Sequence, residues 1–71
     1  MTLGTALKQA RIAQQLNQKQ AARGICAQSM LSAIENDRYV PNARLLLALC
    51  QRLGVAVSTL SLADDFEISA E

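Results

Sequence analysis

Apolar residues recur at helical spacing from the start of the chain. Leu3, Leu7 and Ala10 lie three or four residues apart, so they share one face of a helix. Thr2 precedes them and has the hydroxyl that commonly caps a helix N-terminus. This pattern predicts a first helix over residues 3–15.

Two shorter helices follow, separated by a tight turn. Asn17 is a second capping residue, and the segment after it predicts a helix over residues 18–23. Gly24 ends that helix, because glycine adopts left-handed backbone angles without penalty. Beyond the turn, an apolar face that includes Leu31 predicts a third helix over residues 28–35.

The second half of the chain predicts two more helices. Asn42 caps an amphipathic segment that stops at Gly54, which indicates a fourth helix over residues 43–53 after a loop at 36–41. A shorter apolar segment predicts a fifth helix over residues 57–62. No stretch has the convincing alternation of a half-buried strand, so we expect an all-α, compact five-helix fold.

Composition limits the chain to one small domain. Its 71 residues can bury a single modest core, and Tyr39 and Phe66 are the only aromatics, so that core must be aliphatic. We expect the domain to span residues 1–62, and residues 63–71 to be an acidic tail or the start of a linker.

Charge is unevenly distributed along the sequence. The whole chain has a net charge of +1, but up to Leu62 it has seven basic residues against Glu35 and Asp37, a net charge of +5. The last nine residues add four acidic ones. A basic body with an acidic tail fits a protein that binds a polyanion and directs its tail away from it.

Residue content disfavours several other function classes. The chain has no His, and Cys26 and Cys50 are its only cysteines, so one chain cannot complete a tetrahedral zinc site. We expect both cysteines to be reduced core residues. We also expect no enzymatic activity, no metal and no cofactor, because neither a phosphate-cradling glycine loop nor a catalytic cluster is recognisable. Without a signal peptide or a long apolar run, the expected location is the cytoplasm, with no membrane contact.

The second and third predicted helices, with a three-residue turn between them, have the arrangement of a helix-turn-helix. The outer face of the third helix has short, uncharged hydrogen-bonding side chains, Gln28, Ser29 and Ser32, with Met30 beside them. A merely solvated face, which is the other interpretation, usually has Lys and Glu. Gln can bond adenine through two hydrogen bonds, Ser can donate or accept, and Met30 suits a thymine methyl group. The pattern therefore favours contact with DNA base edges.

Three segments also show a family resemblance: R-I-A-Q-Q-L-N-Q-K-Q-A-A at 11–22, S-M-L-S-A-I-E-N at 29–36, and P-N-A-R-L-L-L-A-L-C-Q-R-L-G-V at 41–55. Over about residues 3–62 the chain resembles the Cro and repressor class (XRE family) of phage and bacterial regulators. This resemblance implies a lambda-repressor-like fold with its helix-turn-helix formed by the second and third helices. Within the class, G-I-C-A-Q-S-M-L-S-A-I-E at 24–35 is similar to the Rgg and PlcR branch of peptide-responsive regulators.

The resemblance implies roles for individual residues. Gln28, Ser29 and Ser32 match base-contacting positions, while Arg11 and Glu35 match an ion pair that ties the first helix to the end of the recognition helix. The residues that match phosphate-contacting positions lie at the start of the second helix and just after the third: Gln18, Asn36, Arg38 and Tyr39. Apart from the resemblance, we also expect Lys19, beside Gln18, to contact a phosphate.

Two positions beside the third helix have unfavourable local chemistry. Ala27 precedes the helix without a capping oxygen, which is expected to cost about 1 kcal/mol. Asp37 stands where the family commonly has Gly, so we expect a left-handed backbone there, which Asp tolerates better than most residues.

The sequence therefore predicts sequence-specific binding of double-stranded DNA and transcriptional regulation through a recognition helix in the major groove. A homodimer is expected, because one recognition helix contacts only a few base pairs. The branch resemblance implies a C-terminal domain that binds a signalling peptide in a larger regulator. The alternative is a protein-interaction module, such as an antitoxin or docking domain, that uses the apolar residues Leu47, Leu62 and Phe66.

Overall fold

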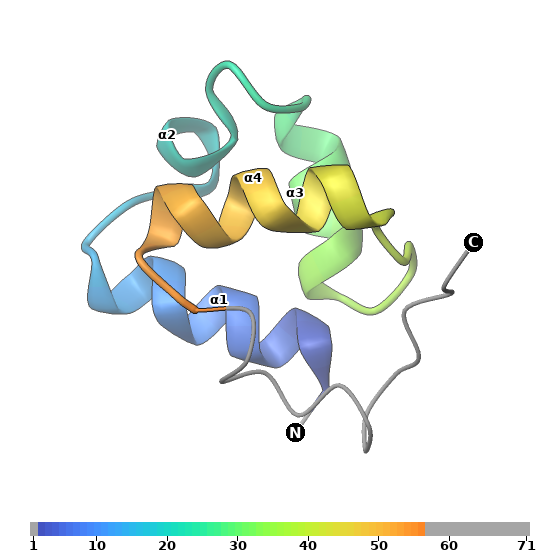
Figure 1. Cartoon of the computed structure of the whole chain (residues 1–71), viewed down its shortest axis with the longest axis horizontal. Helices are drawn as coiled ribbons and strands as arrows, with labels where there is room; N and C mark the ends of the chain where they lie inside the picture. The colour runs from blue at the N-terminus through green and yellow to red at the C-terminus, as the bar shows by residue number, and fades with distance from the viewer. Residues whose placement is uncertain (1, 57–71) are drawn as a thin grey trace.

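A computed structural model describes residues 2–56, and these form four helices and no strand. The helices are α1 (Leu3–Ala13), α2 (Gln18–Ala22), α3 (Gln28–Glu35) and α4 (Ala43–Leu53). Figure 1 shows α4 lying across the front of the bundle, with α2 above it, α1 below it and α3 passing behind it. The all-α prediction is confirmed for this part of the chain, but the structure has four helices, not five. The fifth, predicted at 57–62, lies outside the described residues, as does the tail at 63–71.

Side-chain caps fix where three of the helices begin. The Thr2 hydroxyl accepts a hydrogen bond from the Thr5 N–H, and the Asn42 side chain accepts one from the Leu45 N–H at 2.8 Å. Asn17 forms a capping box with Gln20, in which each side chain accepts from the other residue's backbone N–H, at 2.7 and 2.8 Å. The predicted caps are confirmed, and the box explains why so short a helix as α2 starts sharply.

The ends of α1 and α2 differ slightly from prediction. The first helix ends at Ala13 instead of residue 15, because Gln15 takes a left-handed φ of 61°. The Leu16 N–H then donates to the Arg11 carbonyl at 3.1 Å, which closes the last turn. The second helix ends at Ala22, one residue early.

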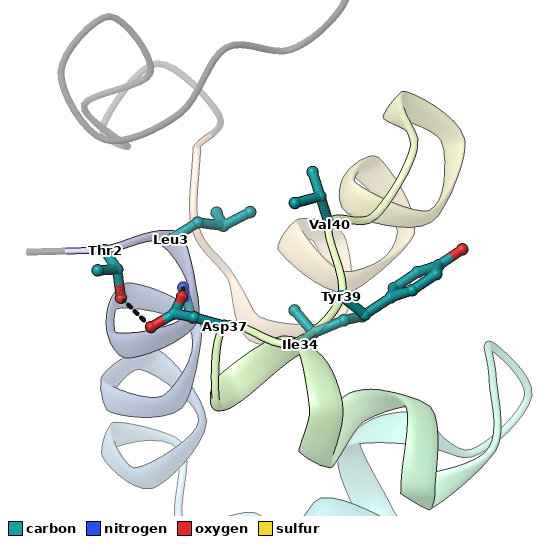
Figure 2. A pocket seen from close by; sticks show the side chains of 7 residues that line it. Thr2, Leu3, Ile34, Asp37, Tyr39 and Val40 are labelled. Atoms are coloured by element: carbon teal, nitrogen blue, oxygen red, sulfur yellow. Dashed lines mark hydrogen bonds between the residues drawn. The ribbon is translucent and has the colours of Figure 1, made fainter.

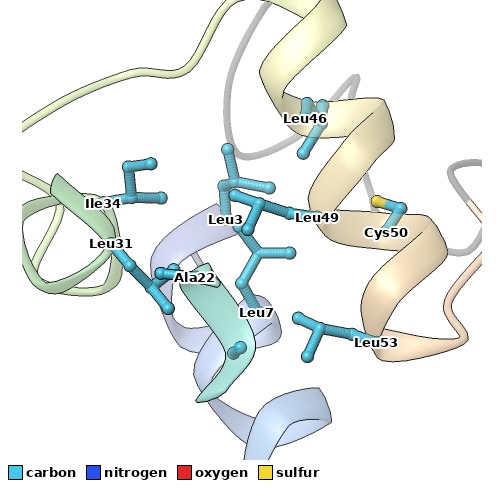
Figure 3. Close-up of a cluster of buried hydrophobic side chains, with 10 residues drawn as sticks. Leu3, Leu7, Ala22, Leu31, Ile34, Leu46, Leu49, Cys50 and Leu53 are labelled. Atoms are coloured by element: carbon cyan, nitrogen blue, oxygen red, sulfur yellow. The ribbon is translucent and has the colours of Figure 1, made fainter. Parts of the chain in front are cut away.

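Aliphatic side chains from all four helices form one core (Figure 3). Leu7, Leu31 and Leu49 are completely buried at its centre, and Ala21 packs there with no exposed surface. The members of the core are Leu3, Leu7, Ala21, Ala22, Leu31, Ile34, Leu46, Leu49, Cys50 and Leu53. Because α3 contributes Leu31 and Ile34 to this core, its opposite face is fixed towards solvent.

The start of α3 is the weakest helix start, because Ala27 has no side-chain hydrogen bond to the helix. Its backbone is already extended (φ −69°, ψ 149°), which is the conformation that a capping residue needs. We expect Ala27→Ser to stabilise the domain by about 1 kcal/mol and to raise the thermal midpoint by about 4–8 °C. Thermal unfolding followed by circular dichroism measures this, with Ala27→Val as the control, because valine enlarges the side chain without adding a hydrogen-bond acceptor. Equal midpoints for Ala27→Ser and the wild type would contradict the prediction.

Candidate nucleic-acid interface

The turn between α2 and α3 is held by backbone hydrogen bonds and by the core. Gly24 takes a φ of 77°, and the N–H groups of Ile25 and Cys26 both donate to the Ala22 carbonyl, at 2.8 and 3.0 Å. The side chains of Ile25 and Cys26 pack against the core. The predicted helix-turn-helix is therefore a rigid unit in which α3 has a fixed orientation relative to α2.

Arg52 on α4 connects that helix to the end of α2 by hydrogen bonds. Its guanidinium donates to the carbonyls of Gln20 and Arg23, both at 2.9 Å, so it caps the last turn of α2. Arg52 is also exposed, so the same guanidinium faces solvent, and local sequence pattern gives no indication of its contact with α2. Gln14 makes a similar long-range contact, in which its side-chain amide donates to the Leu53 carbonyl at 3.1 Å.

Three of the candidate base-contacting residues, Gln28, Ser29 and Ser32, lie on the side of α3 away from the core. Gln28 and Ser29 are exposed in its first turn, and Ser32 is half-buried further along. The fourth, Met30, is half-buried and packs against the core. The outer side of α3 therefore offers uncharged hydrogen-bond donors and acceptors.

Beneath that surface, Glu35 joins three helices. Its side chain is 2% exposed and accepts two hydrogen bonds from Arg11, from Nε at 2.7 Å and from Nη2 at 3.1 Å. The third guanidinium nitrogen of Arg11 donates to the Leu16 carbonyl at 2.9 Å. The predicted ion pair is thus present in the structure, with two parallel hydrogen bonds of the kind that fixes relative orientation.

Gln18, a candidate phosphate ligand, belongs to the same network. Its side-chain nitrogen donates to Glu35 Oε1 at 3.0 Å, which the sequence did not suggest. An amide nitrogen has two hydrogens, so this bond leaves one for another acceptor. The effect is to hold the Gln18 amide beside the C-terminal half of α3.

The other candidate phosphate ligands are exposed. Lys19 lies on α2, while Arg38 and Tyr39 lie in the loop after α3. The Asn36 side chain folds back onto its own helix and donates to the Ser32 carbonyl at 2.8 Å. Two of the candidates, Gln18 and Asn36, therefore have intramolecular partners in the structure.

Charge on the described residues is strongly one-sided. Their two carboxylates, Glu35 and Asp37, both accept intramolecular hydrogen bonds. The basic side chains other than Arg11 are exposed: Lys8, Lys19, Arg23, Arg38, Arg44 and Arg52. The surface of this part of the chain is therefore positive, which favours a polyanion.

The two cysteines are free thiols, with Cys50 buried and Cys26 half-buried. Burial raises the pKa of both thiols, although a backbone hydrogen bond involving Leu31 partly opposes this at Cys26. A raised pKa keeps both groups protonated at neutral pH, which suits packing more than reactivity. No helix among residues 2–56 is long and apolar enough to span a membrane.

Comparison with protein families gives a match to a helix-turn-helix family model (HTH_3) over residues 7–60. No curated protein and no solved structure matched the chain. The matched segment covers most of the sequence and includes the two helices and the turn described above. The all-helical fold and the arrangement of α2 and α3 agree with this match. The chain therefore belongs to the HTH_3 family of helix-turn-helix domains.

Proposed function

We propose that this protein regulates transcription by binding specific sequences of double-stranded DNA, with α3 in the major groove. The observation that supports this most strongly is the outer face of α3, where Gln28 and Ser29 are exposed and uncharged. Amide and hydroxyl groups of this kind match the hydrogen-bonding patterns of base edges. Because the orientation of α3 is fixed, those groups form a surface that is already arranged before it meets the base edges.

Phosphate contacts on both sides of the recognition helix complete the proposal. Gln18 and Lys19 lie at the start of α2, and the loop after α3 supplies Asn36, Arg38 and Tyr39. Contacts to phosphates set the register of a protein on DNA, and base contacts add the specificity. One such domain contacts a single half-site, so we propose that the functional unit is a homodimer.

The Rgg and PlcR resemblance around residues 24–35 suggests the type of regulator. We propose a bacterial, cytoplasmic protein whose DNA-binding domain is controlled by a signalling peptide bound to a further domain. We also propose that the domain has no enzymatic activity and needs no cofactor, since its proposed work is reversible binding.

Base contact by α3 is tested with the double variant Gln28→Ala, Ser29→Ala. Selection of bound duplexes from a random pool is expected to give a short motif for the wild type and no motif for the variant. Affinity for the selected site should fall at least about tenfold, because a good two-bond base contact contributes about 1–3 kcal/mol of discrimination. Affinity for unrelated duplexes and the salt dependence should hardly change, since no charge is removed.

Gln9→Ala is the matched control, because Gln9 is an exposed glutamine on α1. A motif that survives the double substitution would rule out base contact by Gln28 and Ser29. A wild-type domain that binds no duplex at low salt would contradict the whole proposal. That outcome would favour the second candidate, a protein-interaction module, for which Leu47 on α4 is the relevant surface residue at 51% exposure.

A further inference from the structure

Asp37, the first residue after the cap of α3, makes contacts that its position on a loop does not require. One carboxylate oxygen accepts a hydrogen bond from the Thr2 hydroxyl at 2.9 Å, and the other accepts from the Gly4 N–H at 3.2 Å. Figure 2 shows the Asp37 side chain directed at the start of α1. The loop after α3 is thereby joined to the N-terminus of a helix more than thirty residues earlier in the sequence.

Backbone geometry alone does not explain an aspartate here. Asp37 has a left-handed φ of 61°, and the Arg38 N–H donates to the Ala33 carbonyl at 2.8 Å, as in a typical helix C-terminus. Glycine takes this conformation with less strain than any other residue. An aspartate at this position therefore contributes through its side chain, and the side chain's partners are Thr2 and Gly4.

The segment that Asp37 anchors includes candidate phosphate ligands. Arg38, Tyr39 and Val40 follow it directly and are exposed, and the next residue, Pro41, is buried. The exposed stretch is thus attached to the body of the domain at Asp37 on one side and at Pro41 on the other. In Figure 2 the Tyr39 ring points away from α1, opposite to the Asp37 carboxylate.

A contact between Asp37 and DNA is not the reason for its presence, because a carboxylate repels phosphates. Both of its oxygens accept hydrogen bonds from the start of α1. They lie at a pocket of about 240 Å³ between the start of α1 and the loop, which is lined by Thr2, Leu3, Gly4, Ile34, Asp37, Tyr39 and Val40. Any effect of Asp37 on DNA binding must therefore act through the placement of its neighbours.

We propose that Asp37 is a positioning residue for DNA binding: by joining the loop to α1, it holds Arg38 and Tyr39 where they meet the phosphates beside the recognition helix. This proposal rests on the proposed function, since it needs DNA as the ligand. It assigns to the α1 N-terminus a role in the interface, although that terminus contributes none of the predicted DNA ligands.

The test compares Asp37→Asn with Asp37→Gly. Both variants remove the same charge, and both residues accept a left-handed backbone. Asparagine keeps the link, because its carbonyl can accept from the Gly4 N–H and its amide can donate to the Thr2 hydroxyl. Glycine removes the link, so the difference between the two variants isolates it.

Asp37→Asn is expected to bind the selected duplex at least as tightly as the wild type, and Asp37→Gly about 5–10-fold more weakly than Asp37→Asn. The slope of log affinity against log salt should be smaller for Asp37→Gly by about 1, the change expected for one lost phosphate contact. When Arg38→Ala is added to Asp37→Asn, affinity for the selected duplex should fall. When it is added to Asp37→Gly, affinity should change little further. Both variants should select the same base motif.

A second measurement needs no DNA. Tyr39 is the only tyrosine and the chain has no tryptophan, so intrinsic fluorescence anisotropy reports motion of this loop. Anisotropy should be lower for Asp37→Gly than for Asp37→Asn at a temperature where circular dichroism shows both to be folded. Equal anisotropy, affinity and salt slope for the two variants would overturn the positioning role. Failure of the wild type to bind any duplex would overturn the proposed function instead, and the anisotropy would still decide whether Asp37 fixes the loop.

Discussion

Glu35→Gln is expected to destabilise the domain by about 3–5 kcal/mol, the typical cost of removing one partner of a buried ion pair. The substitution keeps the shape of the side chain but leaves the Arg11 guanidinium, whose side chain is 11% exposed, without its negative partner. One end of the new amide would also present N–H groups to the N–H groups of Arg11 or Gln18. For a domain of this size such a loss is a large part of the total stability.

Urea unfolding followed by circular dichroism measures this effect, and the double variant Arg11→Met, Glu35→Leu is its control. The double variant leaves no unpaired buried charge, so it should be more stable than Glu35→Gln although it has lost the whole pair. If Glu35→Gln unfolds at the urea concentration of the wild type, the pair contributes nothing net to stability. Glu35→Gln also alters the acceptor of the Gln18 amide, so its effect on DNA affinity has to be measured at a temperature where this variant is folded.

Helix positions in this chain are predictable where the signal is local. The bounds of α3 and α4 agree with prediction, because an apolar stripe fixes each helix and Asn42 and Gly54 mark the ends of α4. The first helix ends two residues earlier than predicted, since its left-handed residue is Gln15 and no glycine marks the helix end. Signals for helix ends depend on residue type, and glutamine is not a residue type that routinely adopts a left-handed backbone.

Contacts between distant segments were not predictable from local pattern. The hydrogen bonds of Arg52 to α2 and of Asp37 to α1 join residues about thirty positions apart, and an exposed polar residue gives no sign of them. Arg11 and Glu35 are the exception, because a family resemblance identified them as a pair. The sequence could therefore suggest the candidate site residues but not the hydrogen bonds that hold Gln18 and the loop in place.

Gly4 is a further residue that local pattern misjudges, and Gly4→Ala is expected to destabilise the domain by about 3 kcal/mol. Helix propensity alone predicts the opposite, since alanine in a helix interior is favoured over glycine by about 1 kcal/mol. In the structure, however, Gly4 is buried, and a Cβ there would lie 2.7 Å from both the Glu35 carbonyl oxygen and Asp37 Oδ1, and nearer still to the Ile34 carbonyl oxygen. Two of these atoms belong to the backbone at the end of α3, which cannot rotate away as a side chain can, so the helices must separate.

Gly24→Ala is the matched control for Gly4→Ala, because it adds the same methyl group but causes backbone strain instead of steric overlap. Gly24 has a left-handed φ of 77° and no neighbouring atom within 4 Å of an added Cβ, so its substitution should cost only the backbone strain of about 1–2 kcal/mol. Thermal and urea unfolding should therefore rank the wild type first, Gly24→Ala second and Gly4→Ala last. Separation of α1 from α3 should also break the Gly4–Asp37 hydrogen bond, so Gly4→Ala should lower the Tyr39 anisotropy and Gly24→Ala should not. If Gly4→Ala is instead more stable than the wild type, helix propensity outweighs steric overlap, and the close approach of α1 to α3 is not a requirement of the fold.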